Sequence, residues 1–153
     1  SMGIATAVVD HRDYDDRSSF ERALVAVLLE HGVEAVALAG FMRIVTGTFL
    51  EAFPGRVLNI HPSLLPAFPG AHAHRDALAH GVKVSGCTVH LVTEEMDAGP
   101  IVAQAAVPVA EGDTEDSLAE RVLEQEHRIY PEAVRLLAEG RLRVHGRRVE
   151  ISD

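Results

Sequence analysis

Two short stretches of the sequence contain residue types that could act together on a carbonyl group. Asn59 and His61 precede a proline-rich segment, and Asp97 lies in a polar turn that contains glycine and proline. Because side chains alternate along a strand, Asn59 and His61 would point to the same side and could act on one atom. An amide beside an imidazole suits carbonyl chemistry, since both can donate a hydrogen bond to a developing oxyanion. We therefore interpret Asn59, His61 and Asp97 as candidate catalytic residues.

The elements around these residues are predicted to bring them together. The apolar run at 57–60 predicts a buried strand, and open α/β sheets bind ligands at the carboxyl ends of such strands. The loop 61–70 contains three prolines, which exclude regular structure and hold the chain in a defined path. Two further strands are predicted over 86–92 and 101–109, and an antiparallel pair is one arrangement open to them. The turn that joins them can aim Asp97 inward.

The remaining periodicity predicts a parallel sheet flanked by helices. An apolar run over 35–39 is bounded by glycines, as expected for a strand covered on both faces. Pro131 is expected to kink or divide the long helix that starts at Asp113-Thr114. The other predicted elements are a strand over 6–9, a helix capped by Ser18 or Ser19 that stops at Gly32, a short helix opened by Thr46 or Thr48, a helix over 75–80, and a terminal hairpin of 142–144 and 148–151.

Length and composition predict one soluble domain. A chain of 153 residues with 47% hydrophobic residues can bury a core as a single domain. We take this domain as 3–153 and set Ser1-Met2 aside as a tag-cleavage scar or the remnant of a start codon. No apolar stretch is long enough to cross a bilayer and no signal segment opens the chain, so we expect a cytoplasmic protein without a membrane partner. The single cysteine, Cys87, is expected to be a buried packing residue.

The charge and histidine patterns argue against two kinds of partner. The chain has 14 basic and 23 acidic residues, a formal net charge of -9, which disfavours binding to nucleic acid. Among the nine histidines, His72 and His74 have the tightest spacing, but no set of partners completes a metal site with them. We therefore expect small-molecule substrates, no nucleic acid and no metal.

Three motifs resemble the signature of the glycinamide ribonucleotide formyltransferase family. They are Gly40 to Ile44 (Gly-Phe-Met-Arg-Ile), Asn59 to Pro66 (Asn-Ile-His-Pro-Ser-Leu-Leu-Pro) and Met96 to Pro100 (Met-Asp-Ala-Gly-Pro), and the resemblance runs from about Gly3 to the end of the chain. The interval of 36 positions between His61 and Asp97 is the spacing expected for that family's histidine and aspartate. Formyl-folate hydrolases resemble Asn-Ile-His-His-Ser-Phe-Leu-Pro instead, and methionyl-transfer-RNA formyltransferases carry a basic surface that this acidic chain lacks.

The resemblance implies transfer of the formyl group of 10-formyltetrahydrofolate to the amine of glycinamide ribonucleotide in purine biosynthesis. The amine would attack the formyl carbon, and Asn59 with protonated His61 would stabilise the resulting oxyanion. A nearby carboxylate favours the imidazolium, so Asp97 would keep His61 charged and could relay the amine proton through water. No metal is required. The alternatives are a formyltetrahydrofolate hydrolase and a folate-binding fragment without turnover.

The same resemblance assigns two binding regions. The nucleotide substrate would contact Gln125 and Glu126, although from the residues alone Glu126 is a surface carboxylate paired with Arg121 or Arg128. For Arg43 the alternative is a structural role on carbonyl groups beneath the sheet. The folate would lie against three segments, with Arg17 available to its carboxylated tail. The residues assigned to this region are Arg17, Met42, Arg43, Ile44, Val45, Asn59, Thr93, Glu94, Glu95, Met96 and Asp97.

The fold implied by the resemblance is an α/β domain built on an open, mostly parallel twisted sheet with helices on both faces, of the Rossmann-like formyltransferase type. Members of the family begin with strand–helix units that include a phosphate-binding glycine loop, and nothing in this sequence matches them. We therefore expect the chain to lack those amino-terminal units and to bind folate better than the nucleotide. We also expect a homo-oligomer formed through exposed sheet surface, by pairing or exchange of residues 6–31.

Overall fold

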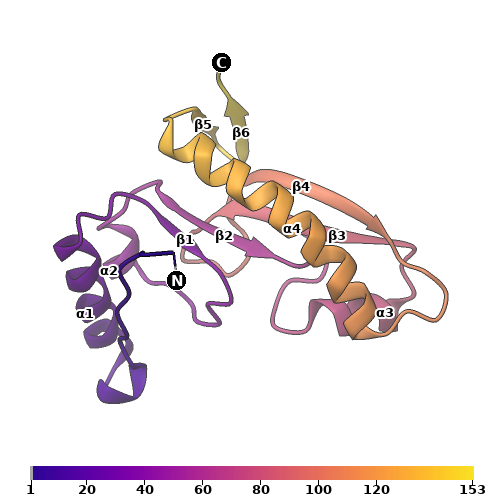
Figure 1. The fold of residues 1–153 in the computed structure, drawn as a ribbon, viewed down its shortest axis with the longest axis horizontal. Helices are drawn as coiled ribbons and strands as arrows, with labels where there is room; N and C mark the ends of the chain where they lie inside the picture. The colour runs from indigo at the N-terminus through magenta and orange to yellow at the C-terminus, as the bar shows by residue number, and fades with distance from the viewer. Residues whose placement is uncertain (1) are drawn as a thin grey trace.

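The computed structural model describes residues 2–153 as an open six-stranded sheet with helices packed against it (Figure 1). The strands lie in the order β1-β2-β3-β4-β6-β5. Along the chain the elements are η1 (a 3-10 helix, His11–Asp13), α1 (Arg17–Glu30), β1 (Val36–Leu38), α2 (Gly47–Leu50), β2 (Val57–His61), α3 (Ala73–His80), β3 (Val84–Leu91), β4 (Ile101–Pro108), α4 (Glu115–Ala138), β5 (Leu142–His145) and β6 (Arg148–Ile151).

The strands run in mixed directions, which corrects the prediction of a mostly parallel sheet. β1 pairs with β2 in parallel, and β4 pairs with β6 in parallel through Ile101 and Arg148. The pairs β2–β3, β3–β4 and β5–β6 are antiparallel. The reason for the β3–β4 pair is its short connection, because parallel neighbours need a crossover of a dozen residues or more. The antiparallel arrangement that the sequence left open for these two strands is therefore the one adopted.

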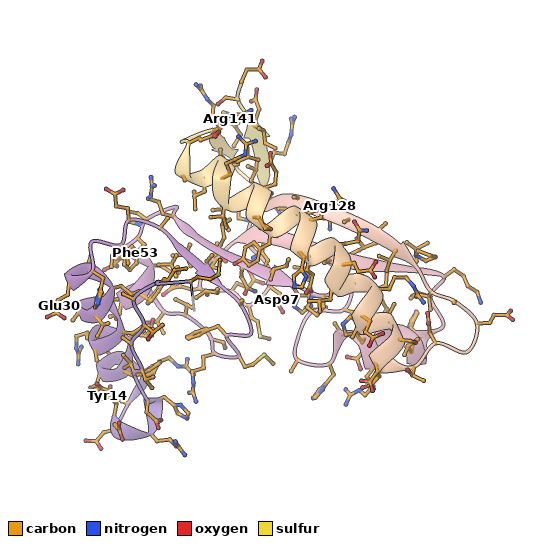
Figure 2. The ribbon with its side chains drawn as sticks, viewed as in Figure 1. Tyr14, Glu30, Phe53, Asp97, Arg128 and Arg141 are labelled. Carbon is orange, nitrogen blue, oxygen red and sulfur yellow. The ribbon has the colours of Figure 1, made fainter. Side chains whose placement is uncertain are left out.

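Helices cover both faces of the sheet, as predicted. Along β2, Leu58 packs with Leu118 of α4 in one core cluster, whereas its neighbour Val57 packs with Phe53 in a second cluster around α1 and α2. Because adjacent side chains of a strand point to opposite faces, α4 lies on one face and α1 with α2 on the other. Figure 1 shows α4 running across β3 and β4. In Figure 2, Asp97 lies between these two groups of elements.

Helix α4 is continuous over 24 residues, although Pro131 was expected to kink or divide it. Its start is a capping box, in which the side chains of Thr114 and Ser117 each accept a hydrogen bond from the other's backbone N–H. Ile129 and Ala133, on either side of the proline, are buried in the same core cluster. Packing of this face therefore holds both halves of the helix against the sheet.

The amino-terminal segment differs from the prediction. Residues 2–10 have no regular structure, so the predicted strand over 6–9 is wrong. The apolar residues Ile4 and Val8 are exposed there. A strand is stable only when its backbone groups pair with a neighbouring strand, and this segment is not part of the sheet.

Two details of α1 and β1 also correct the sequence predictions. Asp16, and not Ser18 or Ser19, caps α1, because its carboxylate accepts a hydrogen bond from Ser19 N at 2.7 Å. β1 has only three residues and Ala37 at its centre is exposed, so this strand is not covered on both faces. Within residues 2–153, the edge of β1 that faces away from β2 has no partner strand.

Other predicted elements are confirmed. α2 begins after Thr46, and α3 ends at Gly81, which adopts the left-handed conformation with a φ of 77°. β5 and β6 form the terminal hairpin. Cys87 is fully buried in the main core cluster as a packing residue. Across the described residues, no helix has both the length and the apolar character that crossing a membrane requires.

Candidate active site

Strand β2 carries Asn59 and His61 to one side of the sheet at its carboxyl end. Leu58 and Ile60, which alternate with them, belong to the core under α4. Asn59 is half-buried, and His61 is 6% exposed. The predicted alternation along this strand is therefore confirmed.

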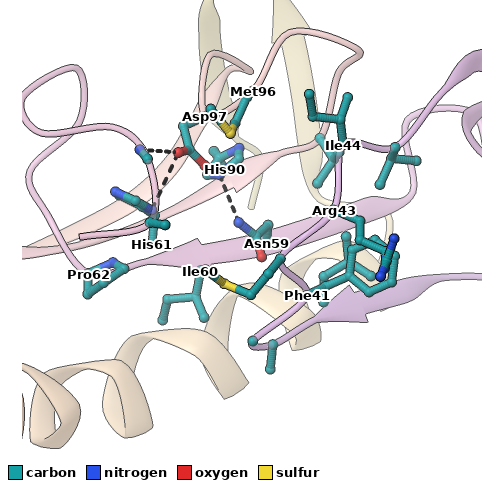
Figure 3. A pocket seen from close by; sticks show the side chains of 18 of the residues that line it. Phe41, Arg43, Ile44, Asn59, Ile60, His61, Pro62, His90, Met96 and Asp97 are labelled. Atoms are coloured by element: carbon teal, nitrogen blue, oxygen red, sulfur yellow. Dashed lines mark hydrogen bonds and ion pairs between the residues drawn. The ribbon is translucent and has the colours of Figure 1, made fainter. Parts of the chain in front are cut away.

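Both ring nitrogens of His61 face groups that can only accept hydrogen bonds. Nε2 lies 2.9 Å from the carbonyl oxygen of Phe68, so Nε2 carries a hydrogen. Nδ1 lies 3.6 Å from Oδ2 of Asp97 (Figure 3). That distance is too long for a direct hydrogen bond, so Nδ1 has no direct partner in Asp97. The geometry therefore fixes the ring of His61 through Nε2 and leaves Nδ1 beside the carboxylate of Asp97.

The turn between β3 and β4 aims Asp97 at the same place. Asp97 has a φ of 52°, in the left-handed region that aspartate tolerates better than most residues. Its Oδ2 accepts a hydrogen bond from Gly70 N at 2.9 Å, so the carboxylate also ties the turn to the end of the proline-rich loop. The side chain is 10% exposed, and the predicted inward orientation is confirmed.

Gly99 holds this turn in place, and we predict that an alanine there lowers both stability and turnover. A Cβ at position 99 would lie 1.7 Å from the carbonyl oxygen of Leu91, so the backbone would have to move. We expect Gly99→Ala to lower the free energy of unfolding by about 1–3 kcal/mol. We also expect a lower kcat, because Asp97 moves with the turn. Urea unfolding and steady-state kinetics measure the two effects.

Gly112→Ala is the matched control for this prediction. Gly112 lies between β4 and α4, has a φ of 79°, and leaves open space where a Cβ would be. An alanine there should cost about 1–2 kcal/mol of backbone strain without disturbing the site. Equal losses of kcat in the two variants would contradict a specific role for Gly99.

His90 from β3 is a site residue that the sequence did not reveal. β2 and β3 are antiparallel with Asn59 opposite His90, so the two side chains share a face. Nε2 of His90 lies 3.3 Å from Nδ2 of Asn59 and 3.9 Å from Oδ1 of Asp97. Burial lowers the pKa of His90. In the sequence, Thr88 and His90 alternate with apolar residues, which indicates that they share one face of a strand. This pattern does not predict that the strand pairs with the one that carries Asn59.

A buried hydroxyl group anchors the proline-rich loop to β3. Oγ1 of Thr88 donates to the carbonyl oxygen of Ser63 at 2.7 Å and accepts from Leu65 N at 3.1 Å. It also accepts from Nε2 of Gln104 at 3.0 Å. Thr88 lies opposite His61 in the β2–β3 pairing, so these bonds fix the loop immediately after the imidazole.

The site borders a cavity of about 390 Å³. Three residues predicted for the binding regions lie outside its lining. Arg17 is exposed at the start of α1, Glu94 accepts a hydrogen bond from Gly47 N, and Gln125 accepts one from Nε of Arg128. The predicted residues that do line the cavity are Asn59, His61, Asp97, Met42, Arg43, Ile44, Val45, Thr93, Glu95, Met96 and Glu126.

Glu126 reaches this cavity from α4 and is half-buried. The two arginines suggested as its partners bond to other residues: Arg121 to Asp113 and Arg128 to Gln125. Burial raises the pKa of the Glu126 carboxyl group. Glu126 is thus a carboxylate that faces the cavity, and not one paired with either arginine.

The arrangement provides the groups needed for chemistry on a carbonyl. An amide, an imidazole and a carboxylate meet at one cavity, and donors held in this way can stabilise an oxyanion. The cavity lies at the carboxyl end of β2, where open α/β sheets bind ligands. In the described chain, no group of three or more histidine, cysteine, aspartate or glutamate side chains could hold a metal ion. Fold and site together define an α/β domain with a candidate site for carbonyl chemistry at the carboxyl end of β2.

Comparison with known proteins identifies the family. A family model described as formyl transferase matches residues 1–134, and the chain belongs to that family. It is 54% identical over 142 residues to the trifunctional purine biosynthetic protein adenosine-3 of Gallus gallus. It is 47% identical over 143 residues to the phosphoribosylglycinamide formyltransferase of Escherichia coli strain K12. The crystal structure of glycinamide ribonucleotide transformylase 1 from Symbiobacterium toebii matches with a TM-score of 0.92 and 62% identity.

The chain spans only part of the length of these relatives. The matches cover 93% of this chain but 14% of the Gallus gallus protein, and 94% of this chain but 68% of the Escherichia coli protein. The Symbiobacterium toebii structure is matched over 68% of its chain and 94% of this one. The functions in these names therefore belong to longer proteins.

Proposed function

We propose that the protein transfers the formyl group of 10-formyltetrahydrofolate to the amine of glycinamide ribonucleotide, as a cytoplasmic step of purine synthesis. The observation that carries the proposal is the convergence of Asn59, His61 and Asp97 on one cavity. The name of the Escherichia coli relative, a phosphoribosylglycinamide formyltransferase, supports the choice of acceptor. Membership of the formyl transferase family supports the choice of transferred group.

In the proposed reaction the substrate amine attacks the formyl carbon, and the formyl oxygen gains the negative charge. One N–H of the Asn59 amide faces His90, which leaves the second N–H for this oxygen. The Nδ1–H of a charged His61 lies too far from Asp97 for a direct hydrogen bond, at 3.6 Å, so it is available as a second donor. Donors of this kind lower the barrier by roughly 3–4 kcal/mol each.

Asp97 is assigned the proton transfer in this proposal. Collapse of the tetrahedral adduct keeps the new carbon–nitrogen bond and breaks the bond between the formyl carbon and the folate nitrogen. The proton lost by the amine has to reach that folate nitrogen, and the Asp97 carboxylate can pass it through water. Its hydrogen bond from Gly70 N holds the carboxylate in one orientation for this task.

The two substrates are assigned to different parts of the cavity wall. Residues 42–45 and the turn 93–97 are proposed to contact the folate, and all of these except Glu94 line the cavity. Glu126 is proposed to contact the ribose of the nucleotide, with Gln125 beside it on α4. The half-buried Glu126 carboxyl group faces the cavity, where it could accept hydrogen bonds from sugar hydroxyl groups.

We expect Arg43, rather than Arg17, to hold the carboxylated tail of the folate. Arg43 lines the cavity and lies over the ring of Phe20, 6.0 Å from its centroid, whereas Arg17 is exposed outside the lining. Arg43→Gln should raise the KM for 10-formyltetrahydrofolate about two- to fivefold with little change in kcat, because an exposed ion pair contributes up to about 1 kcal/mol. Arg17→Gln is the control in the same initial-rate assay. A larger rise in KM from Arg17→Gln would reverse the assignment.

One assay separates the proposed function from its alternatives. The purified protein is supplied with 10-formyltetrahydrofolate, with and without glycinamide ribonucleotide. Formylated nucleotide formed at the rate at which tetrahydrofolate appears supports transfer. Tetrahydrofolate and formate released without the acceptor would show a hydrolase instead. Binding of a folate analogue without either product would show a binding protein and contradict the proposed transfer.

We also propose that this chain self-associates through the outer edge of β1. That edge has no partner strand among the described residues, and the segment 2–10 exposes Ile4 and Val8. Unpaired edges of this kind accept strands from a second copy. We expect light scattering to give the mass of a dimer or a larger assembly, reduced to that of one chain by Val8→Lys. A monomer of the unmodified chain at high concentration would contradict this proposal.

A further inference from the structure

His90 lies where it can set the orientation of the Asn59 amide. It is 2% exposed and stands opposite Asn59 in the pairing of β2 with β3. Its Nε2 faces Nδ2 of Asn59 at 3.3 Å, and its Nδ1 faces the carbonyl oxygen of Leu91 at 3.1 Å. Figure 3 shows the ring of His90 between the side chains of Asn59 and Asp97.

The hydrogen-bond partners of His90 determine which nitrogen is protonated. The carbonyl oxygen of Leu91 can only accept, so Nδ1 carries a hydrogen. Nε2 then carries one only if the ring is charged, and burial lowers the pKa of His90. In the neutral ring Nε2 is an acceptor. An acceptor has to face the NH2 end of the Asn59 amide and not its oxygen.

The surrounding charges do not reverse this conclusion. Oδ1 of Asp97, 3.9 Å from Nε2, favours the charged ring, as does the carbonyl oxygen of Leu91, whereas His61 disfavours it. Desolvation is the largest of these influences, and the pKa of His90 is lowered on balance. The other charged residues that line the cavity are Arg43, Glu95 and Glu126.

We propose that neutral His90 is a positioning residue that fixes the Asn59 amide, so that its second N–H is presented to the substrate oxygen. The role in catalysis rests on the formyl transfer proposed above. Protonation of His90 at Nε2 would turn the acceptor into a donor. It would favour the opposite amide orientation, with Oδ1 of Asn59 toward the ring and the NH2 group withdrawn from the substrate.

Two substitutions test the role in catalysis. His90→Phe removes the acceptor while filling similar space, and His90→Gln can return an acceptor oxygen toward Asn59. We expect His90→Phe to lower kcat about tenfold or more with the KM for 10-formyltetrahydrofolate within about twofold, and His90→Gln to recover much of the loss. Equal losses in both variants, or a change in KM alone, would overturn the role.

Nuclear magnetic resonance of the ligand-free chain tests the tautomer without any turnover. We expect long-range proton–nitrogen spectra at neutral pH to show His90 protonated on Nδ1 and unprotonated on Nε2, with His90→Gln identifying its signals. Acidification below the ordinary imidazole pKa of about 6.5 should shift the side-chain amide signals of Asn59 together with those of His90. A ring protonated on Nε2 at neutral pH would overturn the inference even in an active enzyme. If His90 shows the expected tautomer but the protein transfers no formyl group, the proposed function is contradicted and the inferred orientation of Asn59 stands.

Discussion

Replacing His61 by alanine is expected to lower kcat about a hundredfold or more, the effect of losing one preorganised donor to an oxyanion. The imidazole is 6% exposed, its Nε2 is held by the carbonyl oxygen of Phe68, and its Nδ1 lies beside Asp97. The donor is therefore in place before the substrate binds. Binding of a folate analogue should change far less, because the cavity is lined mainly by residues of other segments. Steady-state kinetics and calorimetry measure the two quantities.

His145→Ala is the control for His61→Ala. His145 lies in the terminal hairpin, with a side chain that is 64% exposed, and its partner is Glu150. Its loss should leave kcat, folate binding and the midpoint of urea unfolding unchanged. If His61→Ala kept near-normal turnover while remaining folded, the oxyanion role would be wrong.

Asp97→Asn is expected to lower kcat by a similar factor, about a hundredfold, because it removes the charge and leaves the shape. The amide oxygen of asparagine can still accept the hydrogen bond from Gly70 N, so the link between turn and loop can survive. What disappears is the negative charge 3.6 Å from Nδ1 of His61 and the group that could carry the amine proton.

Asp113→Asn provides a matched control for the loss of one carboxylate. Asp113 bonds to Arg121 at 2.7 Å, and neither residue lines the cavity. The Arg121 guanidinium holds the pKa of the Asp113 carboxyl group well below its usual range. The pair stabilises the fold above the ordinary pKa of an aspartate, and this contribution is lost as the pH falls through the lowered value. Asp113→Asn should therefore reduce stability at neutral pH and leave kcat unchanged. Equal effects of both variants on kcat would contradict a specific role for Asp97.

The sequence by itself determined the parts of the site that depend on local pattern. Asn59 and His61 share a side because a strand alternates every two residues, and the apolar residues between them fix which side is buried. Gly99 and Pro100 marked the turn that aims Asp97 inward. The long helix and the terminal hairpin followed from their caps and turns in the same way.

Only the tertiary structure decided the features that depend on which segments become neighbours. The antiparallel register of β2 and β3 places His90 against Asn59, and no local pattern specifies a register between distant strands. The segment 6–9 has strand-forming residues yet stays irregular, because strand formation requires a partner and not only propensity. Arg43 lines the cavity and Arg17 does not, because the packing of the folded chain decides which arginine lies near the site. Position along the chain does not give distance in space, which packing and pairing determine.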